Sequence, residues 1–343
     1  MLVVHRLLLG DTLMLSPLLA RLRAAWPQAV IDLAVSPAFA ALYAGRPWGV
    51  NAMAWDPADR KSLTPFLEGG DYDLALVPGD NRYSWLAQAA GARWIVAHQG
   101  DTPGWKNWPI DELRPFPAVP SAWGDMVADL VDGPPAPTYH PSQWPAPAAR
   151  PFDRPSGPCA VLHVGASTPL KRWPADRWHA IADRLEAQGL RPVFLAGRGE
   201  ESVVREIDPA GRWANTAGRL DLAQVWQLLS EARLLIAPDT GVSHLGRLVG
   251  VPTIALFGPG SAIICGAGAF WRMSPFWPVT VPDFPCRDQT VLFRRSLPWV
   301  RRCGRSTTAC AHPRCMDALG LDRVDAAIGR ALAVPWPRAS RPW

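Results

Sequence analysis

The chain has 343 residues, of which 48% are hydrophobic and 19% are charged. This composition excludes a disordered or coiled-coil protein, and the length predicts two domains. The 35 lysines and arginines exceed the 30 aspartates and glutamates by five, a balance that permits an anionic substrate or a membrane surface without requiring either.

The beginning of the chain does not have the pattern of an export signal. Its first 25 residues are apolar, but His5, Arg6, Asp11 and Arg21 interrupt them, and no small-residue cleavage site follows. No stretch approaches ~18 uninterrupted apolar residues, so no transmembrane helix is expected. Six cysteines are too few for a disulfide scaffold. These observations predict a cytoplasmic protein.

The N-terminal half alternates short apolar runs with helical patterns. Asp11 and Thr12 occupy the N-cap position of a helix that is expected to begin directly after Asp11. Further helical or loop segments are expected at 37–44 and 84–90. This alternation is typical of a parallel sheet wound with helices. Strands are predicted at residues 2–5, 29–35, 50–55, 73–77 and 93–97.

A proline-rich stretch follows, with nine prolines in residues 133–158. Proline fixes φ and lacks a backbone donor, so this stretch forms neither a helix nor a central strand. A new strand begins directly after it, which favours an interdomain linker over a long surface loop within one domain. We therefore expect an N-terminal domain over 1–150 and a C-terminal domain over 151–343.

The C-terminal half repeats the plan of the first. The sequence predicts an α/β protein with two Rossmann-like, doubly wound domains that face a ligand cleft near the carboxyl ends of their strands. Helices are expected at 174–188, 200–207, 222–232 and 242–248. Strands are expected at 159–164, 192–196, 213–215, 234–237 and 253–257.

The strongest candidate site follows the most apolar predicted strand. Asp239, Thr240 and Gly241 stand between this strand and a helix, where free backbone N–H groups and the helix dipole favour an anion such as a diphosphate. His244 lies one turn into the helix. The alternative is an aspartate N-cap with a glycine that permits a tight turn.

Two other turns between a strand and a helix carry polar side chains. Ser167, Thr168 and Lys171 follow the first strand of the second half, and two hydroxyls with a lysine can neutralise a diphosphate. The alternative there is a solvated loop with a capping hydroxyl. Asp11 follows the first strand of the chain, where it can act as a general base or as a helix cap.

Three segments, in this order, resemble glycosyltransferase family 9, the heptosyltransferases of lipopolysaccharide inner-core assembly. They read LGDTLMLSPLLARLRAAWPQAVID near the start, KRWP in the middle, and PDTGVSHLGRLVGVPTIALFGPGS later. The resemblance extends from Leu2 to about Leu332 and is weakest between about Asn107 and Pro158. It implies a GT-B fold with the acceptor in the N-terminal domain and the nucleotide sugar in the C-terminal domain.

The resemblance also implies inverting transfer of heptose from ADP-heptose to a lipid A-Kdo glycolipid. The protein would then work in the cytoplasm, peripherally on the inner face of the inner membrane, with no cofactor or metal required for catalysis. It implies Asp11 as the base, His5 and Arg6 as acceptor contacts, and Glu200 or Glu201 on the ribose. It assigns the donor and its phosphates to Ser167, Thr168, Lys171, Asp239, Thr240, Gly241 and His244.

A cysteine- and arginine-rich segment lies near the C-terminus. Cys286, Cys303, Cys310 and Cys315 have spacings of x16, x6 and x4 and include no Cys-x-x-Cys pair. The family includes autotransporter-modifying members that bind iron through four cysteines, so structural zinc or iron is one interpretation and reduced buried thiols the other. The arginines suit a phosphorylated glycolipid or, alternatively, a solvated face; they are 287, 294, 295, 301, 302 and 305.

Several rival functions remain at this point. A family 9 enzyme could use another nucleotide sugar, such as a rhamnose donor, or could glycosylate a protein such as an autotransporter. A dinucleotide-dependent oxidoreductase requires G-x-G-x-x-G after a strand, and neither 197–202 nor 258–263 completes that pattern. A non-catalytic sugar-nucleotide sensor is a further alternative. No nucleic-acid-binding signature is found.

Overall fold

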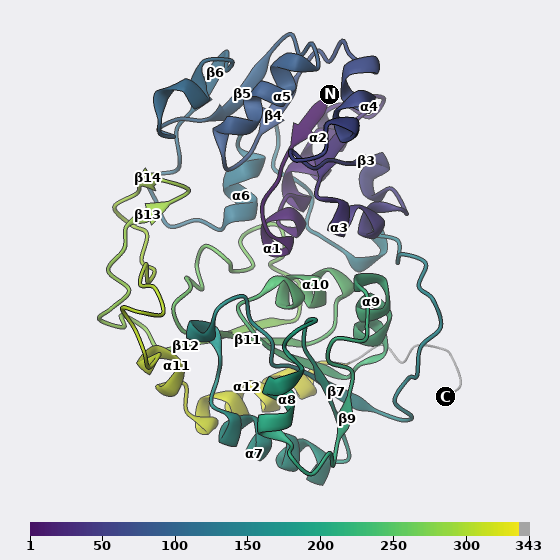
Figure 1. Cartoon of the computed structure of the whole chain (residues 1–343), viewed down its shortest axis with the longest axis vertical. Coiled ribbons are helices and arrows are strands. Elements are labelled where there is room, and N and C mark those ends of the chain that lie inside the picture. The colour runs from purple at the N-terminus through teal and green to yellow at the C-terminus, as the bar shows by residue number, and fades with distance from the viewer. Residues whose placement is uncertain (336–343) are drawn as a thin grey trace. The chain divides into compact units, whose positions relative to one another are not determined.

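The computed structural model describes residues 1–335, and the chain forms two compact units (Figure 1). The N-terminal unit combines Met1–Pro147 with two later segments, Gly268–Arg272 and Thr290–Val300. The C-terminal unit combines Ala148–Ala267 with Met273–Gln289 and the chain from Arg301 onward. The expected ranges 1–150 and 151–343 did not include this exchange of segments, and residues 336–343 of the second range lie outside the described residues.

The N-terminal unit is built on a six-stranded sheet in which all strands run parallel, in the order β3-β2-β1-β4-β5-β6. The order reverses between β1 and β4, as in a doubly wound fold. The strands are β1 (Leu2–Val4), β2 (Asp32–Val35), β3 (Asn51–Ala54), β4 (Ala75–Val77), β5 (Ile95–His98) and β6 (Glu112–Arg114). The helices are α1 (Leu9–Leu13), α2 (Ser16–Ala25), α3 (Pro37–Ala40), α4 (Thr64–Glu68), α5 (Ser84–Ala89) and α6 (Trp123–Ala128).

The first helix begins earlier than expected. The sequence placed Asp11 at the N-cap, but α1 starts at Leu9 and Asp11 lies in its first turn. The backbone N–H of Leu8 donates to Oδ2 of Asp11 at 3.3 Å, so this carboxylate closes the helix end from inside. Asp11 therefore still contributes to capping, from the third helical position.

The C-terminal unit has a second six-stranded parallel sheet, in the order β12-β11-β10-β7-β8-β9. Its order reverses between β7 and β10, so both units have Rossmann-like topology, as expected. The strands are β7 (Cys159–His163), β8 (Arg191–Leu195), β9 (Ala214–Asn215), β10 (Leu234–Pro238), β11 (Thr253–Phe257) and β12 (Phe276–Thr280). The helices are α7 (Ala175–Ala187), α8 (Glu201–Ile207), α9 (Leu222–Glu231), α10 (Gly241–Val249), α11 (Arg314–Asp317) and α12 (Leu321–Ala333).

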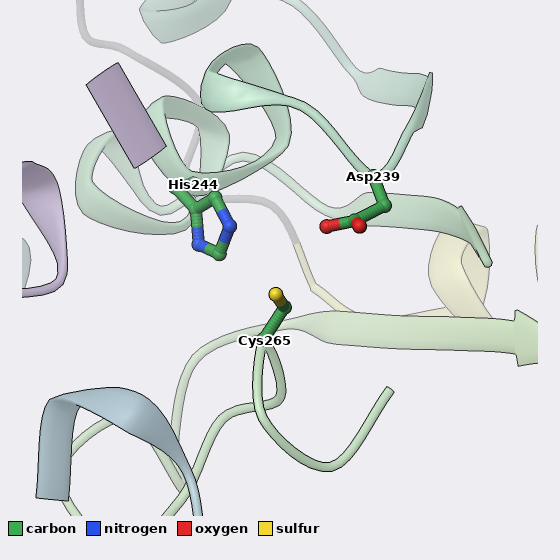
Figure 2. Close-up of side chains that lie close together, drawn as sticks. All are labelled: Asp239, His244 and Cys265. Carbon is green, nitrogen blue, oxygen red and sulfur yellow. The ribbon is translucent and has the colours of Figure 1, made fainter. Parts of the chain in front are cut away.

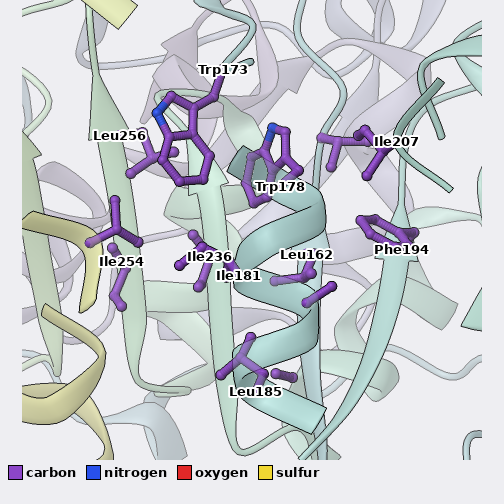
Figure 3. Close-up of a cluster of buried hydrophobic side chains, with 14 of the residues drawn as sticks. Leu162, Trp173, Trp178, Ile181, Leu185, Phe194, Ile207, Ile236, Ile254 and Leu256 are labelled. Carbon is purple, nitrogen blue, oxygen red and sulfur yellow. The ribbon is translucent and has the colours of Figure 1, made fainter. Parts of the chain in front are cut away.

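Helix α7 shows how apolar spacing builds the core of this unit (Figure 3). Its buried side chains recur at helical spacing and pack against Leu162, Phe194 and Ile236 of the sheet; they are Trp178, Ile181, Ala182 and Leu185. Trp173 lies edge-on to Trp178 with ring centroids 5.1 Å apart. The indole N–H of Trp173 donates to the carbonyl of Leu319 at 2.8 Å, which satisfies its buried polar atom.

A small hairpin from late in the chain completes the N-terminal unit. Its strands are β13 (Val291–Leu292) and β14 (Arg295–Ser296), which pair antiparallel. Arg295 is 4% exposed and donates to the carbonyls of Gly79, His98 and Gln99 and to the amide oxygen of Asn81, at 2.6 to 3.1 Å. The sequence alone did not predict this contact, which joins residues about 200 positions apart.

Buried charges surround this arginine. Nη2 of Arg295 lies 3.7 Å from Asp101, and Lys106, which is 1% exposed, pairs with Asp80 at 2.8 Å and Asp101 at 3.1 Å. Buried charges of this kind are tolerated only when each has a partner. The arginine of the hairpin is thus part of the core of the N-terminal unit.

Candidate active site

The C-terminal unit brings two predicted loops together at the point where its strand order reverses. Strands β7 and β10 are direct neighbours and run parallel, so the loops that follow them open at the same edge of the sheet. This is the position at which open α/β sheets bind ligands. The loop after β7 leads to a 3₁₀ turn at Pro169–Lys171, and the loop after β10 leads directly into α10.

Lys171 and Asp239 form an ion pair across these two loops. The ammonium group of Lys171 lies 3.0 Å from Oδ2 of Asp239 and 2.7 Å from its backbone carbonyl. The aspartate side chain is 7% exposed and the lysine side chain 26%. A Cβ at Gly260 would collide with the Asp239 carboxylate, so a glycine is needed where the loop after β11 approaches it. The Asp239 carboxylate is therefore held in place by its surroundings, while the ammonium group of Lys171 remains accessible to a ligand.

His244, near the start of α10, lies beside Asp239 (Figure 2), and Thr240 is the N-cap of the same helix. We call this region, with the Lys171–Asp239 pair, the Lys171 corner. His244 is 4% exposed, and its burial, with the neighbouring charges of Arg247 and Lys171, holds its pKa well below the usual value. Within residues 1–335, Nδ1 of His244 and Oγ1 of Thr240 are buried without a hydrogen-bond partner. Such groups at a helix N-terminus are suited to an anionic, hydrogen-bonding ligand.

Cys265 and Arg247 belong to the same corner, although the sequence analysis did not single them out. The Arg247 guanidinium is buried and donates to the carbonyls of Gly266 and Cys265, each at 2.8 Å, and lies 4.0 Å from the ring centroid of Phe276. Burial lowers the pKa of Arg247 to about 10. Arg247 thus anchors the loop that carries Cys265. The sequence could have indicated this role, because an arginine in an otherwise apolar helix needs a partner when it is buried.

The remaining donor-side candidates differ in their surroundings. Ser167 is exposed, and Oγ1 of Thr168 accepts a long hydrogen bond from the backbone of Leu170 at 3.4 Å. Thr168 therefore caps the turn that carries Lys171, as in the alternative of a loop with a capping hydroxyl. Gly241 is the first residue of α10, as the sequence predicted.

Glu200 and Glu201 are used differently. The two carboxylate oxygens of Glu200 each accept a backbone N–H at 2.8 Å, from Ala166 and Gly197, so this residue ties the turns after β7 and β8 together. A role on the ribose is therefore not supported for Glu200. The Glu201 carboxylate accepts the N–H of its own backbone and that of Gly199, the latter at 3.1 Å, and these bonds lower its pKa. It does not connect two turns as Glu200 does, so it is the better candidate of the two.

In the N-terminal unit, the two expected acceptor contacts also differ. His5 is fully buried, which argues against the predicted contact with an acceptor. Arg6 is partly exposed and lies 3.8 Å from Asp56, and its carbonyl accepts the hydroxyl of Tyr83. Arg6 therefore remains available, next to the turn that leads to Asp11.

Buried histidines predict how stability responds to pH. Burial lowers the pKa of His5 and of His163 to about 4, although for His163 the charge of the nearby Glu200 opposes this shift. In the unfolded chain both titrate near 6.5, so between about pH 6.5 and pH 4 the unfolded state binds more protons. We expect the free energy of unfolding, measured with urea, to fall from pH 7 to pH 5.

A matched pair of variants tests this assignment. His163→Gln should reduce the loss of stability between pH 7 and pH 5, whereas the same change at the exposed His140 should leave that loss as it is. A protein that became more stable at pH 5 would contradict the prediction.

The four late cysteines line one pocket of about 200 Å³ with His312. Among residues 1–335, the group of three such ligand atoms within 4.8 Å of one another is Asp239, His244 and Cys265, so the four cysteines would have to move closer together to hold a metal. The arginines of this region are not simply a solvated face either. Arg295 is buried, and Arg287 donates to the carbonyls of Phe257, Gly258 and Val281.

Comparison with known proteins gives a consistent result. Residues 61–269, more than half of the chain, match the family model described as glycosyltransferase family 9 (heptosyltransferase). Lipopolysaccharide heptosyltransferase 1 of Pseudomonas aeruginosa is 26% identical over 318 residues, which cover 83% of this chain and 85% of that protein. The structure also contains, among its described helices, none with the length and apolar character needed to cross a membrane.

Two solved structures show the same fold. ADP-heptose LPS heptosyltransferase II of Escherichia coli superposes with a TM-score of 0.72 at 18% identity, over 96% of this chain and 98% of that one. The iron-containing dodecameric glycosyltransferase TibC of enterotoxigenic E. coli H10407 superposes with a TM-score of 0.60 at 16% identity, over 96% and 77%. At these identities the likeness shows a GT-B architecture.

Proposed function

The chain belongs to glycosyltransferase family 9 and is a glycosyltransferase, and from this premise we propose that it transfers heptose from ADP-heptose to a lipopolysaccharide core acceptor. Transfer would invert the anomeric carbon and need no catalytic metal. The named relatives support heptose and lipopolysaccharide, since one is a lipopolysaccharide heptosyltransferase and another an ADP-heptose enzyme. The acceptor would be a glycolipid that the enzyme meets at the cytoplasmic face of the inner membrane.

The observation that carries the donor side of this proposal is the Lys171–Asp239 pair at the strand reversal. Departure of ADP places negative charge on its diphosphate, and a preorganised cation with free helix N–H groups stabilises that charge. Lys171 supplies the cation, and α10, nine residues long, presents its N-terminus from Gly241. These groups can perform the task that a metal performs in other transferases.

The acceptor side rests on Asp11. Inverting displacement needs one base that removes the proton from the attacking hydroxyl as the new bond forms at the anomeric carbon. Asp11 is partly exposed and lies in the turn after β1, with Oδ2 held by the N–H of Leu8. We assign it the role of that base.

Binding of nucleoside diphosphates tests the choice of donor. Calorimetric titration with ADP, UDP, GDP and dTDP, without added metal and with EDTA present, should show a clear preference for ADP. A preference for another nucleotide would retain the fold and the proposed mechanism but exclude ADP-heptose as the donor. Failure of every nucleotide to bind would contradict the assignment of this corner.

Replacing Lys171 by methionine should weaken ADP binding about ten- to a hundredfold. The exchange keeps an unbranched side chain but removes the terminal ammonium group and its charge, and hydrogen bonds to charged groups contribute about 1.5–3 kcal/mol each. The exposed neighbour Arg172, changed to methionine, is the matched control and should bind ADP normally. Equal affinities of the two variants would place the phosphates elsewhere.

A second candidate function is heptose transfer to a protein. It is favoured by the pocket lined by four cysteines and by the likeness to the fold of an iron-containing glycosyltransferase. Cys286, Cys303, Cys310 and Cys315 would hold zinc or iron there as a structural metal, and no catalytic step depends on it. Elemental analysis of the purified protein, beside that of Cys303→Ser, tests this: bound iron lost in the variant supports it.

A further inference from the structure

We propose that Asp239, His244 and Cys265 form a site for a divalent transition metal of the zinc class, and that an occupied site excludes the donor diphosphate. The second half of this statement rests on the proposed function, because it places the diphosphate beside Lys171. The first half depends only on the three side chains.

The geometry brings three different ligand types together, Asp239 and His244 from the turn between β10 and α10 and Cys265 from the loop after β11 (Figure 2). One ligand atom from each residue lies within 4.8 Å of the others, and Asp239 and His244 are buried while Cys265 is partly exposed. Bonds of about 2.0–2.3 Å to a tetrahedral zinc place ligand atoms roughly 3.5 Å apart. Closing the site therefore needs movements of about 1 Å, which Cys265 can provide because it lies in a loop.

The chemistry of the three ligands selects the metal. A thiolate, an imidazole and a carboxylate suit Zn²⁺ or Co²⁺, whereas Mg²⁺ and Ca²⁺ prefer oxygen ligands alone. Three protein ligands leave the fourth tetrahedral position open, as in zinc sites that exchange a bound water. Arg247 holds the carbonyl of Cys265 at 2.8 Å and so keeps this loop beside α10.

Metal binding changes what the corner offers to a phosphate. The Asp239 carboxylate now pairs with Lys171, and a metal bound to that carboxylate would repel the ammonium group and displace it. His244 would also become a ligand and be lost to the donor. Metal and diphosphate thus compete for the same side chains, so micromolar zinc should inhibit the enzyme even though catalysis needs no metal.

Cobalt provides a direct test, because a thiolate bound to Co²⁺ gives a charge-transfer absorption band in the near ultraviolet. The reduced protein, freed of metal with a chelator, should develop this band with one equivalent of Co²⁺, and Zn²⁺ should abolish it. Cys265→Ser should lose the band, whereas the control Cys159→Ser, at a free thiol on β7 outside both cysteine clusters, should retain it. A band that persists in Cys265→Ser but is lost in Cys303→Ser would come from the four-cysteine pocket and would overturn the proposal, as would no band in the wild type.

Addition of ADP separates this inference from the proposed function. Saturating ADP should weaken the affinity for free Co²⁺ at least tenfold in the wild type, once the Co²⁺ that ADP itself chelates in solution has been subtracted. A band that depends on Cys265 but does not respond to ADP, in a protein that binds ADP, would confirm the metal site and overturn the competition. The spectroscopic readout requires no transferase activity, so a wrong sugar or acceptor would not affect it.

Discussion

Replacing Asp11 by asparagine is expected to lower kcat by about 10²–10⁴-fold, the usual contribution of a general base. The amide has the size of the carboxylate but cannot take up the proton of the acceptor hydroxyl. Its side-chain oxygen can still accept the N–H of Leu8, which Oδ2 now accepts at 3.3 Å, so the first turn of α1 should be retained. Initial rates with ADP-heptose and a lipid A-Kdo acceptor measure this effect.

Two controls make this result specific. The KM for the donor should change little, because Asp11 belongs to the N-terminal unit and is not part of the Lys171 corner. Asp73→Asn, at an aspartate of the same unit whose side chain is 84% exposed, should leave kcat unchanged. An Asp11→Asn enzyme with full activity would show that another group acts as the base.

Replacing Arg295 by methionine should destabilise the N-terminal unit by about 3–5 kcal/mol, the usual cost of removing one partner of a buried charge network. The change removes the donors to the carbonyls of Gly79, His98 and Gln99 and to the Asn81 amide oxygen. The Gly79 carbonyl and the Asn81 amide oxygen are then buried without this donor, whereas the His98 carbonyl keeps the side-chain amide of Asn81. Asp101 keeps its ion pair with Lys106.

Hydrogen exchange detects this loss locally, which matters because two units need not unfold in one step. Peptides that contain β4 and β5 should exchange faster in the variant, while those of the C-terminal sheet should be unaffected. Arg294→Met, at the exposed neighbour on the same hairpin, is the matched control and should change exchange little. Unchanged protection of β5 in Arg295→Met would contradict the proposed role.

The sequence predicted well what local patterns determine. Continuous apolar runs identified β7, β10 and β11, and α7 ends within one residue of the expected range 174–188, just before Gly189 with φ of +79°. The elements that were not predicted include β6, β12, the hairpin and the helices α4, α6, α11 and α12. Their strands are short or contain proline, as Pro278 in β12 does, and therefore lack a clear alternation.

Candidate residues that are neighbours in the sequence could be grouped before the structure was known, whereas proximity between distant segments could not. Asp239, Thr240, Gly241 and His244 are close in sequence, so the strand-to-helix turn indicated them. Cys265 belongs to no motif, and its place beside His244 depends on Arg247 and on the packing of the loop after β11. For Glu200 the sequence could not separate two roles. A carboxylate that joins two turns through backbone N–H groups and one that binds a ribose can occupy the same position after a strand.

The interrupted path of the chain also sets an order of events during synthesis. The first segment of the N-terminal unit ends at Pro147, but the hairpin that carries Arg295 is finished only at Val300. At about 5–20 residues per second, the ribosome needs roughly 8–30 s for the intervening stretch. Throughout that interval the hydrogen-bond and ion-pair contacts of Arg295 with Asn81 and Asp101 cannot form. The unit that is begun first thus lacks its buried arginine until both sheets have been synthesised, because β12 of the second sheet ends at Thr280, before the hairpin.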